Sequence, residues 1–177
     1  TVLSPRTASC SVGVRKPVGA FSPILPSVVL KYCNACIRAV ADVGCGHGIS
    51  TMILAEAYPK SQFFGFDFHD HSIEHARKLA TEAGLNNVSY EVATAKTYPG
   101  EEYDLVAYFD CLHDMGDPVG ASAHALKSLN SDGTMMLVEP FANDTLEENL
   151  NPVGRVYYGF STMVCTPSSL GQEVGAA

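Results

Sequence analysis

Residues 40–50 of this 177-residue chain read VADVGCGHGIS, a short apolar run followed by glycines at alternate positions. Gly44, Gly46 and Gly48 form the pattern G-x-G-x-G, and Asp42 stands two positions before the first glycine. An apolar strand that enters a glycine turn and then a helix directs backbone N–H groups toward a ligand, and the missing side chains let that ligand approach the main chain. The spacing predicts a cofactor-binding loop of the nucleotide type between a strand and a helix.

Strand-like and helix-like segments alternate from about residue 38 onward. Strands are predicted at 38–43, 62–66, 88–92, 103–109 and 134–139, and helices at 49–58, 73–83 and 118–129. Ser72 is expected to cap the second helix, and a turn at residues 131–133 is expected to precede the last strand. Because parallel strands need crossover connections, this order predicts an α/β fold with a doubly wound, mostly parallel sheet and helices on both faces. The loops at the carboxyl ends of the strands are then expected to converge: 44–48, 67–71, 93–97 and 110–117.

The chain divides into an irregular arm and one domain. Residues 1–37 contain four prolines and show no sustained helical or strand period, whereas residues 38–177 carry the regular alternation. With 46% hydrophobic and 17% charged residues, the chain is long enough for one hydrophobic core. No apolar run reaches the length of a membrane span, and the first 30 residues lack a signal-peptide pattern, so we expect a cytoplasmic protein.

Charge and cysteine usage argue against several kinds of partner. A formal net charge of −8 disfavours nucleic acid, whose binding rests on Lys and Arg, and favours a small-molecule substrate. The six cysteines are scattered through a chain without a secretory signal, which favours free thiols over a disulfide framework. The C-x-x-C pair at residues 33–36 lacks a second pair, and the adjacent residues 69–71 (HDH) can seldom converge on one ion. We therefore predict no metal site.

Asp67 ends a predicted strand and lies 25 positions after Asp42. An acidic residue about 20 positions past a glycine loop reaches ribose hydroxyls in nucleotide-binding folds, because a carboxylate accepts two hydrogen bonds at once. A solvated turn residue is the alternative interpretation of Asp67. Phe68 and Phe109 lie at strand ends and are candidates to flank the base of a cofactor.

Three further stretches extend the pattern: residues 110–118 (DCLHDMGDP), 138–141 (VEPF) and 151–155 (NPVGR). Together with the glycine loop and Asp67, they resemble the class I S-adenosylmethionine-dependent methyltransferases, in a bacterial subgroup whose members often carry an N-terminal winged-helix-like domain. The resemblance covers about residues 40–175. It implies a Rossmann-like fold and S-adenosyl-L-methionine as the cofactor. It also implies a fragment, because the family's final antiparallel strand pair is expected to be missing, and it leaves open a homodimer of the full-length protein.

The resemblance assigns residues to each part of the cofactor. The loop that holds the methionine half corresponds here to Asp42, Gly44, Cys45, Gly46 and Gly48. In the family, an acidic residue beside an alanine commonly binds the adenine amino group, and Thr94 and Ala95 stand at these two positions. The hydroxyl of Thr94 therefore replaces a charged carboxylate. Asp110 stands at the strand end that lies under the methionine and the sulfonium, where a carboxylate complements positive charge.

Methyl transfer is an in-line displacement, so the protein mainly aligns two partners, and a base helps only some acceptors. His113 is the candidate base, with Asp114 to orient it; a loop histidine that caps a helix or packs against the cofactor is the alternative. The sequence thus predicts a methyltransferase that acts on a small molecule. A cofactor-binding domain without turnover remains open, and an NAD-dependent oxidoreductase is disfavoured because Gly48 falls one position early for the dinucleotide pattern.

Overall fold

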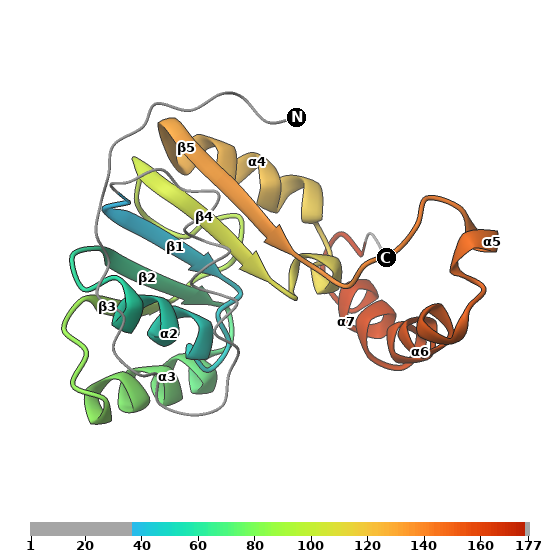
Figure 1. Ribbon diagram of the computed structural model, residues 1–177, viewed down its shortest axis with the longest axis horizontal. Coiled ribbons are helices and arrows are strands. Elements are labelled where there is room, and N and C mark those ends of the chain that lie inside the picture. Colours follow the sequence, from blue (N-terminus) through green and yellow to red (C-terminus); the bar gives the residue numbers. More distant parts are fainter. Residues whose placement is uncertain (1–36, 176–177) are drawn as a thin grey trace.

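A computed structural model describes residues 37–175, which form a five-stranded sheet in the order β3-β2-β1-β4-β5 (Figure 1). The strands are β1 (Ala39–Val43), β2 (Gln62–Asp67), β3 (Val88–Val92), β4 (Tyr103–Phe109) and β5 (Leu129–Val138). All four strand pairings in this part of the chain are parallel, which confirms the predicted α/β fold with a doubly wound sheet. The strand order reverses between β1 and β4, and ligands of such sheets bind beside that point. The predicted N-terminal arm lies outside the described residues, apart from Ile37.

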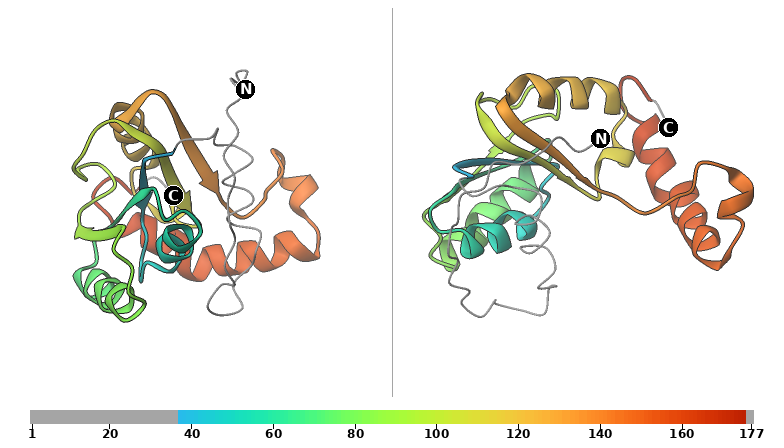
Figure 2. Two further views of the ribbon diagram at one scale, coloured as in Figure 1. Left: turned by 60° about the vertical axis from the view of Figure 1, so that its left-hand side comes forward. Right: turned by 45° about the horizontal axis from the view of Figure 1, so that its top comes forward.

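Helices cover both faces of the sheet, with α2 and α3 on one side and α4 on the other (Figures 1 and 2). Their bounds are α2 (Ile49–Ala57), α3 (Asp70–Glu82) and α4 (Pro118–Ser128). Successive strand residues point to opposite faces, so β1 places Val40 against Leu54 of α2 and places Ala41 in the cluster that contains Ala125 of α4. Two apolar layers therefore hold the sheet in place, and its loop edge is free to form a site.

The chain after β5 leaves the sheet as an arm and returns to the loop after β4 (Figure 2). The arm contains α5 (Leu146–Asn149), α6 (Pro152–Phe160), the π-helical turn η2 (Ser161–Cys165) and α7 (Thr166–Leu170). The end of the arm packs on the 3-10 turn η1 (Leu112–Asp114), which follows β4. None of the helices in residues 37–175 has both the length and the apolar character that a bilayer crossing requires.

Two local predictions are wrong. Helix α3 begins at Asp70 rather than at residue 73, and its N-cap is His69 because the carboxylate of Asp67 already accepts the His69 N–H. Ser72 is therefore inside the helix, where its hydroxyl contacts the His69 ring. Residues 131–133 lie within β5 rather than before it, and the pairing with β4 shifts its register there. A bulge within a strand uses the same residue types as a turn between elements, so the sequence alone does not distinguish the two.

Candidate functional site

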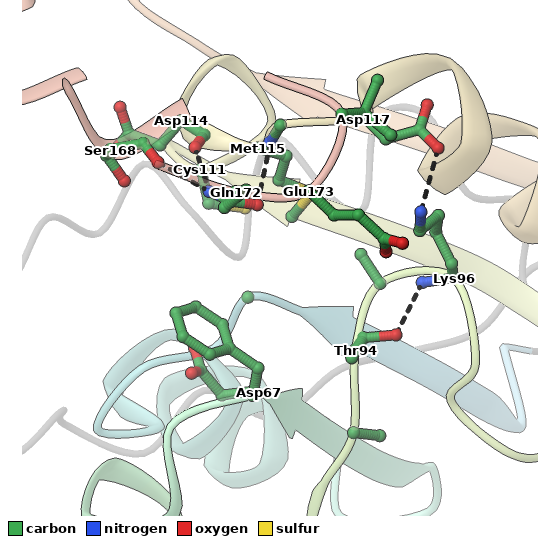
Figure 3. Close-up of a pocket in the computed structure, with 16 residues that line it drawn as sticks. Asp67, Thr94, Lys96, Cys111, Asp114, Met115, Asp117, Ser168, Gln172 and Glu173 are labelled. Carbon is green, nitrogen blue, oxygen red and sulfur yellow. Dashed lines mark hydrogen bonds and ion pairs between the residues drawn. The ribbon is translucent and has the colours of Figure 1, made fainter. Parts of the chain in front are cut away.

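The loops at the carboxyl ends of the first four strands converge on one pocket of about 460 Å³ (Figure 3). This confirms the predicted convergence, and the volume lies in the range of small-molecule and cofactor sites. Six of the predicted site residues line the pocket: Gly44, Asp67, Phe68, Thr94, Ala95 and Asp114. The other predicted residues lie behind the lining or beside it, and their contacts show what each one does.

The glycine loop uses its backbone N–H groups within the protein. The N–H groups of Gly44 and Cys45 both donate to the Phe66 carbonyl, at 2.8 and 3.1 Å. The N–H of Gly46 donates to Oδ2 of Asp67 at 2.9 Å. For these three N–H groups the expectation that they point at a ligand is wrong, because the neighbouring strand β2 already supplies their acceptors. What the loop offers a ligand is close approach to a main chain that lacks side chains.

The three glycines have different roles, although each has a positive φ: 76° at Gly44, 53° at Gly46 and 74° at Gly48. A Cβ atom would lie 2.7 Å from Cys111 Sγ at Gly44 and 2.5 Å from Tyr90 Oη at Gly48. At Gly46 it would meet nothing within 4 Å. Gly44 and Gly48 are thus required by packing, whereas Gly46 leaves open space beside the loop.

Asp42 is buried beneath the loop and is 1% exposed. Its Oδ2 accepts hydrogen bonds from the hydroxyls of Ser50 and Thr51, both at 2.6 Å, which ties β1 to α2. Its Oδ1 is buried and has no hydrogen-bond partner among residues 37–175. Burial raises the pKa of Asp42 from 3.8 to about 6, although the two hydroxyl hydrogen bonds oppose the rise.

Asp67 faces the pocket in a fixed orientation. Its Oδ1 accepts the N–H of His69 and its Oδ2 accepts the N–H of Gly46, each at 2.9 Å. A carboxylate has about four acceptor sites, so both oxygens can accept further hydrogen bonds from a ligand. Phe68 follows at the rim of the pocket and is 71% exposed. Phe109 instead packs against the core on the α2 face and is not part of the lining.

The loop after β3 contributes Thr94, Ala95 and Lys96 to the lining. The ammonium of Lys96 lies 3.1 Å from Oδ2 of Asp117, which also lines the pocket (Figure 3). Sequence reasoning missed this pair, because the two residues are 21 positions apart and only the fold joins their loops. Asp117 alone was recognisable, since an acid before Pro118 is typical of a helix N-cap, and its Oδ1 indeed accepts the Gly120 N–H.

His113 lies between two carboxylates. Its Nδ1 is hydrogen-bonded to Oε2 of Glu139, and its Nε2 lies 3.3 Å from Oδ1 of Asp114. The other Glu139 oxygen accepts the N–H groups of Cys111 and Leu112, at 3.3 and 2.9 Å. Glu139 thus holds the loop that follows β4. The predicted neighbour Asp114 is present, but Glu139 is the partner that the sequence did not identify.

Burial and the neighbouring carboxylates shift the pKa of His113 in opposite directions. Burial lowers the pKa of the imidazole, but the hydrogen bond to Glu139 and the negative charges of Asp114, Glu139 and Asp110 outweigh that effect. The pKa of His113 therefore lies above 6.5. The carboxylate of Asp110 lies close to the side chains of His113 and Glu139, and Asp110 is not part of the pocket lining. Of this group, only Asp114 lines the pocket.

Comparison with known proteins gives this geometry a family context. A family model described as a methyltransferase domain matches residues 38–174. Aklanonic acid methyltransferase DauC of Streptomyces sp. (strain C5) is 36% identical over 104 residues, which are 57% of this chain and 47% of that relative. The chain thus spans about half the length of this curated relative.

Two solved structures have the same fold. YcgJ of Bacillus subtilis has a TM-score of 0.65 and 22% identity, with 82% of this chain and 60% of that chain covered. The O-methyltransferase of a trans-AT PKS multienzyme of Brevibacillus brevis, solved with S-adenosyl-L-homocysteine, has a TM-score of 0.60 and 21% identity. That match covers 71% of this chain and 45% of the other.

Proposed function

Since this chain belongs to the class I S-adenosylmethionine-dependent methyltransferases, we propose that it transfers a methyl group to an oxygen atom of a small-molecule acceptor. The cofactor is S-adenosyl-L-methionine. The names of two similar proteins support this acceptor class. One relative is named an aklanonic acid methyltransferase, and one structure with the same fold is named an O-methyltransferase. The observation that carries the proposal is the pocket at the switch point of the sheet, because it presents Gly44 and Asp67 to one ligand.

The residues around the pocket fit this cofactor. The lining contains four carboxylates and one ammonium, so it favours a ligand with positive charge such as a sulfonium and an α-ammonium. Asp67 has a fixed orientation and spare acceptor sites for ribose hydroxyls. The open space beside Gly46 admits a ligand close to the main chain.

The cofactor, held beside Gly44 and Asp67, would supply a methyl group activated by a positively charged sulfur, with a neutral thioether as the leaving group. The protein then has to align the acceptor and remove its proton. We assign Asp114, which lines the pocket, as the base that accepts the proton of the acceptor hydroxyl. We assign to His113 the role of orienting the Asp114 carboxylate. Glu139 holds His113 in turn. His113 is held by Glu139 and does not line the pocket, whereas Asp114 does, so the imidazole is placed to orient Asp114 rather than to contact the acceptor.

Calorimetric titration tests the cofactor part of the proposal. We expect binding of S-adenosylmethionine and S-adenosylhomocysteine and no binding of NADH. Asp67→Asn should weaken binding roughly 10- to 100-fold, because hydrogen bonds to a charged group are worth about 1.5–3 kcal/mol. Asp132→Asn removes an equal charge at an exposed position in β5 outside the pocket lining and should change nothing. A folded chain that binds neither adenosyl ligand would refute the proposal.

Product formation tests the second part. The release of S-adenosylhomocysteine is measured with a panel of hydroxylated aromatic acids as acceptors. Turnover that falls in Asp114→Asn while cofactor affinity is unchanged supports the assigned role. Tight cofactor binding without any product would instead favour the alternative of a cofactor-binding domain that has no turnover. Residence in the cytoplasm, the absence of nucleic-acid partners and a homodimer stay predictions.

A further inference from the structure

The segment Ser168–Val174 closes one side of the pocket, and we refer to it as the strap. Side chains fix the strap to the backbone of the loop after β4. Ser169, which is 1% exposed, donates its hydroxyl to the Met115 carbonyl at 3.0 Å. Gln172 donates its amide to the Asp114 carbonyl at 2.8 Å and accepts the Gly116 N–H at 2.9 Å. The strap therefore belongs to the wall of the pocket (Figure 3).

Acidic side chains in the pocket lining differ in whether their oxygens have partners. Asp67 accepts two backbone N–H groups, and Asp117 accepts the Gly120 N–H and pairs with Lys96. Oδ1 of Asp114 is buried and lies 3.3 Å from the His113 ring, but it accepts no hydrogen bond from the described residues. Glu173 of the strap has no hydrogen bond or ion pair with any residue in the range 37–175. Its carboxylate is therefore free to accept hydrogen bonds from a ligand in the pocket.

Glu173 faces the loop after β3. Figure 3 shows its carboxylate extending toward Lys96, above Thr94 and on the side of the pocket away from Ser168. Thr94 cannot offer a charge there, and its hydroxyl is already bonded to Thr97 at 2.7 Å. Two backbone N–H groups, of Thr97 and Tyr98, donate to its carbonyl. Thr94 thus serves to shape the turn, and Glu173 is the free acceptor at this end of the pocket.

We propose that Glu173 determines cofactor specificity by accepting a hydrogen bond from the adenine amino group. This inference rests on the proposed function, which places the ribose at Asp67 and the methionine half beside Gly44. The sheet order then leaves the β3 side for the base, since β2 lies between β1 and β3. A carboxylate only accepts hydrogen bonds, so it favours the amino group over any substituent that cannot donate.

The experiment measures binding of two ligands by calorimetry. One is S-adenosylhomocysteine, and the other is its analogue with hydrogen in place of the 6-amino group. The wild-type chain should bind the analogue roughly 10- to 100-fold more weakly, the range that about 1.5–3 kcal/mol for a charged hydrogen bond converts to. Glu173→Ala should lose the same factor for S-adenosylhomocysteine and show no further loss with the analogue. Glu173→Gln keeps an accepting oxygen and should recover part of the discrimination.

Glu147→Ala is the matched control, because it removes an equal charge from an exposed residue of the same arm, and it should behave like the wild type. Circular dichroism checks that each variant is folded. Equal losses for both ligands in Glu173→Ala would overturn the inference, as would a wild type that does not discriminate. In either case binding of S-adenosylhomocysteine leaves the proposed function standing. A folded wild-type chain that binds neither ligand refutes both.

Discussion

We predict that Asp42→Asn stabilises this protein near neutral pH. Asp42 is 1% exposed, and burial raises its pKa from 3.8 to about 6. Keeping a carboxylate ionised inside the fold costs free energy, because the protein interior solvates charge poorly. Asparagine retains the shape and one accepting oxygen for the hydroxyls of Ser50 and Thr51, but it carries no charge.

The magnitude follows from the pKa. One pKa unit corresponds to about 1.4 kcal/mol, so a rise from 3.8 to about 6 costs about 3 kcal/mol when the carboxyl is ionised in both states. The protonated form favours the fold, and this contribution is full below pH 3.8 and is lost as the pH rises to about 6. The amide NH₂ of the asparagine would take the position of Oδ1, which has no hydrogen-bond partner among residues 37–175. Leaving this buried donor unpaired costs about 1–2 kcal/mol. We therefore expect Asp42→Asn to raise the free energy of unfolding by about 1–2 kcal/mol near pH 7.5. Near pH 4.5 the difference between variant and wild type should be about 2 kcal/mol less favourable to the variant.

Urea unfolding followed by circular dichroism at the two pH values measures this difference. The comparison between wild type and Asp42→Asn isolates this carboxyl, because all other titrating groups are common to both. Asp132→Asn, at an exposed position, should show no such pH-dependent difference. A lower free energy of unfolding for Asp42→Asn near pH 7.5, or the same difference from wild type at both pH values, would refute the reasoning.

The remaining predictions concern the glycine loop and His113. Gly48→Ala should lower the free energy of unfolding by about 3 kcal/mol or more, because a φ of 74° is combined with a Cβ 2.5 Å from the Tyr90 hydroxyl; Gly46→Ala should cost only about 1–2 kcal/mol of backbone strain. Equal losses in urea unfolding would contradict this difference. Glu139→Gln should lower the pKa of His113, followed by NMR of the imidazole, and an unchanged pKa would count against their hydrogen bond. Because the folded pKa of His113 is raised, its stabilisation is full below pH 6.5 and is lost at higher pH, so the variant should lose stability mainly at acidic pH.

Periodicity predicted the five strands and the three helices that cover the sheet, because their apolar patterns are local and nearly uninterrupted. It was less accurate at the ends of elements. The start of α3 depends on Asp67, whose carboxylate reaches the His69 N–H, and the extent of β5 depends on its pairing with β4. Both errors arose where a contact outside the segment decided the backbone conformation.

In the candidate site, too, some features follow from local sequence and others only from contacts between distant residues. Asp67 and Thr94 were predictable because strand ends of a parallel sheet share one edge, and Figure 3 places both at the pocket. The pairs Lys96 with Asp117 and His113 with Glu139 join loops that are 21 and 26 positions apart. No local pattern relates such residues, so only the folded chain brings them together.

The sequence by itself determined the fold class and the kind of cofactor loop, since a glycine loop, an acid at the next strand end and alternating strands and helices are local patterns; the resemblance of its motifs to a family implied which cofactor binds. Tertiary structure alone decided what each residue does. A side chain at Gly44 would meet Cys111, and one at Gly48 would meet Tyr90, so distant residues require both glycines. The strap places Glu173 opposite a strand end about 80 positions earlier in the chain. The physical reason is that periodicity and spacing report interactions between near neighbours, whereas burial, charge pairing and the shape of a pocket depend on which distant segments pack together.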